Sequence, residues 1–279
     1  MQMLGKLMKY DMRYMARILP WLYLGAFCLS LLCGAFFLFV PEGLLLEIGS
    51  GIIMYVGTMF VETLVIMTVV FIIMRIYRSL FSDEGYLTFT LPVKNSTVIN
   101  AKILTGAIWT MFTLTVAVIV TMIPSFAQSI RLVSSEYISP EVGYGYAEFG
   151  IGDLAETLIF LFLVAIDVIV ICFLVPSLYT FCAAIVHKAK KARAFASIGM
   201  FVGISYAIIV VLVAIFVIIA LITESYYLYD ELYAEYNPAL FGKYMTFIIP
   251  IVIFAVTAPL TLVSWLVSRH IVDKKLNML

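Results

Sequence analysis

The sequence predicts an all-α integral membrane protein with six transmembrane helices, and three observations predict it. Of its 279 residues, 64% are hydrophobic and 12% are charged, whereas a soluble domain carries about 25% charged residues. Six apolar stretches are each long enough to cross a hydrocarbon core of roughly 30 Å as a helix. The basic residues gather in the connections on one side of those stretches, which is the pattern that orients membrane proteins.

The first element is an amphipathic helix within residues 3–18, ahead of the first apolar stretch. Its apolar side chains recur with a helical period on one face: Leu4, Leu7, Met8, Met15 and Ile18. Its bases fall on the opposite face: Lys6, Lys9, Arg13 and Arg17. This pattern is typical of a helix that lies on the inner leaflet with its bases toward anionic headgroups. Asp11 falls within the apolar face, and the pattern explains no role for it. The helix is either an anchor alone or an anchor that also contacts a cytosolic partner.

The six apolar stretches follow in order, and they contain only two charged residues, Glu62 and Asp167. They cover residues 20–40, 51–74, 103–127, 157–186, 194–223 and 244–268. Backbone polar groups cannot stay unpaired in lipid, and these runs are rich in Leu, Ala and Met, so helices are favoured over a barrel. The connections are too short for a soluble domain, and we expect one membrane domain over residues 1–279.

The connections alternate in charge, and this alternation predicts the topology. All but two of the 17 basic residues lie on one side, and the exceptions are Arg131 and Lys243. Most acids lie on the other side. We therefore expect a multi-pass protein of the cytoplasmic membrane with both termini in the cytoplasm.

The connection between the second and third stretches, within residues 75–102, is longer than a plain hairpin between spans requires. Arg75 and Arg78 stand one turn apart before it, and Gly85 breaks the helix. Pro92 disfavours helix in the residue before it. Asn95, Ser96 or Thr97 is suited to cap the next helix.

Two segments, SDEGYLTFTLPVKNSTVINAKIL (82–104) and LGKLMKYDMRYMAR (4–17), resemble the permease subunit of ABC-2-type exporters of Gram-positive bacteria. The resemblance implies an interfacial elbow helix over residues 1–19. It also implies a coupling helix between spans two and three that docks in a groove of a separate ATPase subunit. The residues expected in or beside that coupling element are Arg75, Arg78, Asp83, Glu84, Gly85 and Tyr86.

The chain lacks a GxxxxGK[ST] phosphate loop, so we expect ATP and Mg²⁺ to be bound by the partner ATPase and no cofactor by this chain. The resemblance implies two ATPase copies, a second permease chain that is identical or related, and membrane lipid as partners. No metal site is expected, because the four cysteines lie within apolar runs and show no CxxC spacing.

The two intramembrane acids are candidates for the substrate pathway. Glu62 and Asp167 lie at similar depths below the outer surface, and a charge there costs at least about 2.5 kcal/mol on insertion scales. Either they help to receive a cationic or amphipathic substrate, or they form polar contacts between helices with hydroxyls such as those of Thr58 or Tyr179.

The expected function is therefore that of a transport subunit, not an enzyme. The expected cargo is hydrophobic or amphipathic, with small amphipathic or antimicrobial peptides first and lipophilic drugs second. A non-catalytic structural or sensor subunit is the alternative. An intramembrane enzyme is disfavoured, because His187 and His270 lie at span edges and no HExxH or GxSxG motif is present.

Overall fold

The computed structural model describes residues 2–40, 44–81, 94–134, 154–186, 193–233 and 238–275, and every regular element in these ranges is an α-helix. The helices are α1 (Gln2–Met15), α2 (Leu19–Phe39), α3 (Leu44–Phe81), α5 (Asn95–Ser134), α7 (Leu154–Val186), α8 (Arg193–Tyr233) and α9 (Pro238–Lys275). The helices from α2 to α9 each contain one stretch long and apolar enough to cross a membrane. For the residues that the structure describes, the prediction of an all-helical chain with six such stretches is confirmed.

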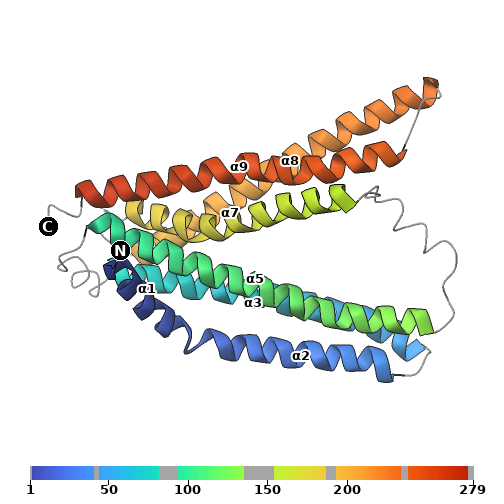
Figure 1. The fold of residues 1–279 in the computed structure, drawn as a ribbon, viewed down its shortest axis with the longest axis horizontal. Helices are drawn as coiled ribbons and strands as arrows, with labels where there is room; N and C mark the ends of the chain where they lie inside the picture. The colour runs from blue at the N-terminus through green and yellow to red at the C-terminus, as the bar shows by residue number, and fades with distance from the viewer. Residues whose placement is uncertain are drawn as a thin grey trace. The chain divides into compact units, whose positions relative to one another are not determined.

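The N-terminal helix α1 is separate from the first span. The chain bends over residues 16–18, and α1 turns away from the direction of α2 (Figure 1). Pro20 lies in the first turn of α2, where its missing N–H would have had no partner within the helix. The sequence predicts a distinct helix before the first span, and α1 is such a helix. The position of α1 at a membrane interface stays a prediction.

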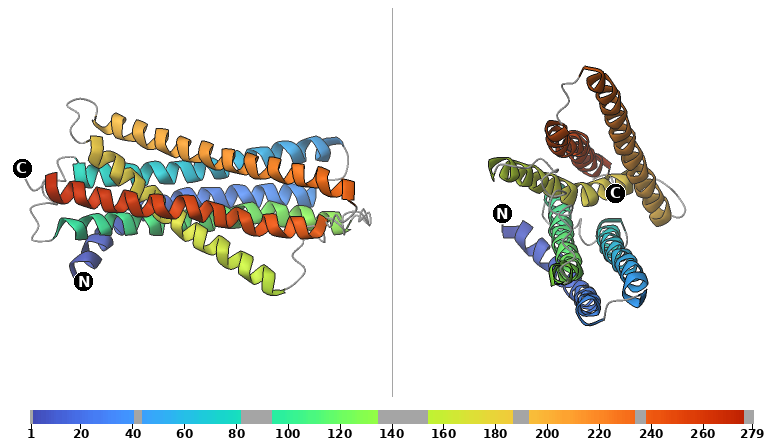
Figure 2. Two further views of the ribbon diagram at one scale, coloured as in Figure 1. Left: turned by 90° about the horizontal axis from the view of Figure 1, so that it is seen from above. Right: turned by 90° about the vertical axis from the view of Figure 1, so that its right-hand side faces the viewer.

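The helices fall into two compact units, residues Met1–Ser139 and Pro140–Leu279. Unit 1 contains α1, α2, α3 and α5, and unit 2 contains α7, α8 and α9. The expectation of a single membrane domain stays a prediction. In unit 1, α2, α3 and α5 lie side by side and α1 packs on α5 (Figures 1 and 2).

Small residues let α2 and α5 approach closely. Ala26, Ser30 and Gly34 recur every fourth residue on the buried face of α2. A Cβ atom added to Gly34 would lie 3.2 Å from Cγ2 of Ile123 on α5. Such small-residue stripes are common where membrane helices pack, because lipid supplies no hydrophobic force and van der Waals contact must hold the pair together.

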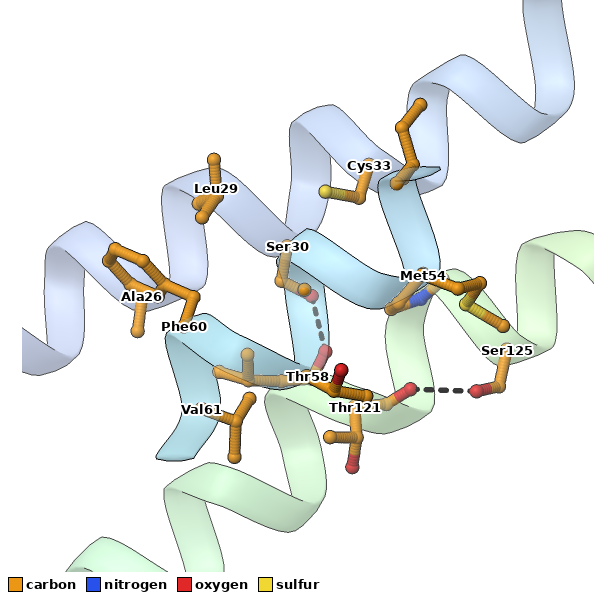
Figure 3. Close-up of a pocket in the computed structure, with 14 residues that line it drawn as sticks. Ala26, Leu29, Ser30, Cys33, Met54, Thr58, Phe60, Val61, Thr121 and Ser125 are labelled. Atoms are coloured by element: carbon orange, nitrogen blue, oxygen red, sulfur yellow. Dashed lines mark hydrogen bonds between the residues drawn. The ribbon is translucent and has the colours of Figure 1, made fainter. Parts of the chain in front are cut away.

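A hydrogen bond between these two helices compensates for Pro124 inside α5. Proline has no N–H, so it cannot donate to the carbonyl four residues earlier, which belongs to Val120. The Ser30 hydroxyl of α2 donates to that carbonyl at 2.6 Å (Figure 3). About two turns away along both helices, the hydroxyls of Tyr23 and Thr113 lie 2.7 Å apart. The α2–α5 contact thus combines close packing with polar bonds.

Unit 2 is built mainly on the packing of α7 along α9. The Ser264 hydroxyl of α9 donates to the Ser177 hydroxyl of α7 at 3.0 Å. Tyr179 of α7 is fully buried, and its ring meets the Phe201 ring of α8 edge to face at a centroid distance of 5.9 Å. Beyond Phe201, none of the described α8 side chains from 202 to 219 is buried. Most of α8 therefore offers an apolar surface that suits lipid or another apolar chain.

Replacing Gly34 by valine is expected to lower the free energy of unfolding of unit 1 by about 1–3 kcal/mol, because the added atoms overpack the α2–α5 contact. SDS titration of the purified protein in mixed micelles, followed by helical circular dichroism, measures the change. Gly25→Val is the matched control on the same helix, since a Cβ atom there meets nothing within 4 Å. Equal stability of the two variants would contradict this packing account.

Candidate functional site

The buried face of α1 contains a charged residue. Asp11 is 1% exposed and Met15 is 4% exposed, while Leu4, Leu7 and Met8 are partly buried. Four of the five residues that the helical period assigns to the apolar face are thus buried or partly buried, whereas Ile18, beyond the end of α1, is exposed. Helix α1 packs against α5. The acid that the pattern left without a role therefore lies at the centre of the α1–α5 contact.

Two cations from two other helices meet the Asp11 carboxylate. Arg75, in the last two turns of α3, donates from Nε to Oδ1 at 2.9 Å, and its Nη2 lies 2.7 Å from the same oxygen. Lys102, near the start of α5, donates from Nζ to Oδ2. Arg75 is 4% exposed and Lys102 is 6% exposed. We call Asp11, Arg75 and Lys102 the charge cluster.

Aromatic side chains of α1 also hold the Arg75 guanidinium. Its central carbon lies 4.5 Å from the centroid of the Tyr14 ring and 5.3 Å from that of Tyr10. A guanidinium over a ring face is attracted by the quadrupole of the ring, and the attraction grows as water is excluded. Arg75 is therefore bound to α1 by both its charge and its flat face.

The charge cluster joins α1 to both helices that flank residues 82–93. Arg75 precedes that segment by two turns of α3, and Lys102 follows it on α5. A buried carboxylate and buried cations are each costly alone, and Asp11 is the anionic partner that Arg75 and Lys102 share. The end of α3, the start of α5 and α1 therefore act as one body where residues 82–93 are attached.

The remaining predicted residues of this region have different environments. Lys6, Lys9, Arg13 and Arg17 are exposed, as the helical period predicts, and so is Arg78. Asp83, Glu84, Gly85 and Tyr86 lie outside the described residues. Their part in ATPase coupling stays a prediction.

The two intramembrane acids lie in different units and have different surroundings. Glu62 of α3 in unit 1 is exposed. Asp167 of α7 in unit 2 is 6% exposed, and its Oδ1 has no hydrogen-bond partner in the described part of the chain.

The two hydroxyls that the sequence offered as partners for these acids bind elsewhere. Thr58 donates to the Tyr55 carbonyl at 2.8 Å, and the Tyr179 hydroxyl lies 3.4 Å from that of Ser197. Neither of these two hydrogen bonds involves Glu62 or Asp167. The role of these acids in a substrate pathway stays a prediction.

Sequence reasoning missed Asp11 and Lys102 as functional residues. The available signal was an acid within the apolar face of an amphipathic helix, because a buried carboxylate requires cationic or hydrogen-bonding partners. Arg75 and Lys102 were visible on either side of one connection. Asp11 is separated from Arg75 by 64 residues and from Lys102 by 91. A local sequence pattern cannot predict contacts over such separations.

In the described ranges, no three His, Cys, Asp or Glu side chains lie close enough to hold a metal ion. Comparisons of the chain with protein-family models, with curated proteins and with solved structures found no match. The charge cluster and the apolar helices are therefore the observations on which a functional proposal rests.

Asp11→Asn is expected to lower the free energy of unfolding by about 3–5 kcal/mol, because it leaves two buried cations without their carboxylate. The same SDS titration measures the loss. Lys9→Gln is the control on the exposed face of α1, where a change within about 0.5 kcal/mol is expected. If Asp11→Asn behaved like Lys9→Gln, the charge cluster would not hold α1 in place.

Proposed function

We propose that this chain is the permease subunit of an ATP-driven exporter of the ABC-2 type, which moves a hydrophobic or amphipathic molecule out of the cell. Two such chains, identical or related, form the pathway. Two copies of a separate ATPase bind ATP and Mg²⁺ and drive alternating access. The chain resides in the cytoplasmic membrane with both termini in the cytoplasm.

The charge cluster is the observation that carries the proposal. An exporter of this kind must turn movement of an ATPase into movement of membrane helices. A loop that transmits force needs rigid attachments at both ends, and Asp11 contacts Arg75 at one end and Lys102 at the other. The cluster supports a role for residues 82–93 as the docking element, with α1 moving together with it.

The composition supports a membrane pathway in this chain and ATP binding in a separate protein. Six apolar helices supply a membrane pathway, whereas the chain has no phosphate loop for ATP. The basic residues concentrated beside residues 82–93 support a cytoplasmic position for that segment, where an ATPase is available.

The cargo follows from the chemistry of the apolar helices. Long runs of apolar side chains, with Asp167 buried in one of them, favour an apolar or amphipathic molecule over a sugar or an inorganic ion. A small amphipathic peptide, as in antimicrobial peptides and toxins, is the first candidate, and a lipophilic drug is the second.

Replacement of residues 82–92 by a Gly/Ser segment of equal length is expected to abolish capture of an ATPase that co-purifies with the tagged wild-type chain from its native membrane. Mass spectrometry identifies the partner by its phosphate-loop peptide. Scrambling of residues 276–279 at the C-terminus is the control and should retain the partner. A wild-type chain that brings down no ATPase with or without ATP would favour the structural or sensor alternative.

Glu62→Gln and Asp167→Asn are expected to slow export while leaving assembly with the ATPase intact, because each removes an ionisable group from the proposed pathway. ATP-driven accumulation of a fluorescent amphipathic cationic peptide in inside-out vesicles measures export, and co-purification measures assembly. Transport at the wild-type rate by both variants would mean that these two acids have no role in the substrate pathway.

A further inference from the structure

A cavity of about 130 Å³ lies between α2, α3 and α5 of unit 1. We propose that it binds a small apolar molecule that carries one hydroxyl group, with that hydroxyl donating a hydrogen bond to the wall. The proposal concerns a site apart from the charge cluster, and it does not depend on the exporter assignment.

The walls are mostly apolar, with a few hydroxyl groups from α2, α3 and α5. Three helices supply the residues that carry the argument: Ser30 and Cys33 from α2, Gly57 and Thr58 from α3, and Thr121 and Ser125 from α5 (Figure 3). Thr58 and Ser125 are exposed, so the cavity opens at the surface of the unit on their side. A lipophilic molecule dissolved in the bilayer has access to such an opening.

Every hydroxyl on the wall already donates its proton to a backbone carbonyl. Ser30 donates to Val120 at 2.6 Å, and Thr58 donates to Tyr55 at 2.8 Å. Thr121 donates to Val118 at 2.9 Å, and Ser125 donates to Thr121 at 2.9 Å. A hydroxyl has one proton and two acceptor lone pairs. The hydroxyls of the cavity therefore offer acceptors without donors, and they complement a ligand that brings a proton of its own.

The size and charge of the cavity narrow the ligand class. A dry cavity of about 150 Å³ holds a benzene molecule, so a single ring or a short chain is the appropriate size. No Asp, Glu, Lys or Arg lines the cavity, and a cationic ligand would lack a counter-charge in a medium of low dielectric constant. A neutral alcohol or phenol satisfies both the apolar walls and the hydroxyl acceptors.

Photolabelling with 4-azidophenol, on the full-length protein in lipid vesicles, tests the proposal. The label should enrich on residues of the cavity wall relative to residues 202–219 of α8, none of which is buried and which serve as the reference for simple partition into the bilayer. Phenol should compete about five-fold better than anisole at equal bilayer concentration, the preference that one net hydrogen bond confers.

Two matched glycine variants separate a filled cavity from a damaged fold. A Cβ atom at Gly57 or at Gly25 meets nothing within 4 Å, and only Gly57 lines the cavity. Gly57→Leu should abolish the enrichment, whereas Gly25→Leu should retain it.

Three results would overturn the proposal. Wall labelling no higher than on α8 would mean that the cavity holds water or lipid only. Equal competition by phenol and anisole would mean that the cavity does not recognise the hydroxyl proton of the ligand. Enrichment that survives Gly57→Leu while that variant keeps wild-type stability in the SDS titration would place the label outside the cavity.

Discussion

The position of α1 depends on one buried carboxylate. Asp11 accepts hydrogen bonds from Arg75 of α3 and from Lys102 of α5, and all three side chains are buried. Charges removed from water are tolerated only when their partners are held in good geometry. The helices that carry them must therefore keep their mutual positions, which a loosely attached amphipathic helix would not require. The aromatic rings of Tyr10 and Tyr14 against Arg75 strengthen this requirement.

Packing inside the membrane follows a different rule from packing in water. Lipid is as apolar as the helix surfaces, so close contact and hydrogen bonds hold the helices together. The small residues of α2 and the Ser30 bond to the carbonyl freed by Pro124 serve this purpose in unit 1. The bond between Ser177 and Ser264 serves it in unit 2. Of the four hydroxyls around the unit 1 cavity, Ser30 donates to another helix, and Thr58, Thr121 and Ser125 donate within their own helices. All four keep lone pairs that can accept a hydrogen bond from a ligand.

Asp11 and Lys102 belong to the two segments, residues 4–17 and 82–104, that motivate the proposal of an exporter permease. The two side chains bond to each other at the contact of α1 with α5, and Arg75 of α3 joins them there. A polypeptide with membrane helices and no phosphate loop needs an external source of energy for active transport, and the attachment of residues 82–93 at two fixed points suits the transfer of force from such a source.

The sequence by itself determined the number and order of the apolar helices, because the length of an apolar run is a local property that decides whether a helix can cross the membrane. It also determined the exposed basic face of α1, because a helical period needs only neighbouring residues. Only the tertiary structure decided the partners of Asp11, since Arg75 and Lys102 lie 64 and 91 residues away. It also decided that Glu62 is exposed while Asp167 is buried. Both acids look alike in an apolar run, and burial depends on which face of the helix a neighbouring helix covers.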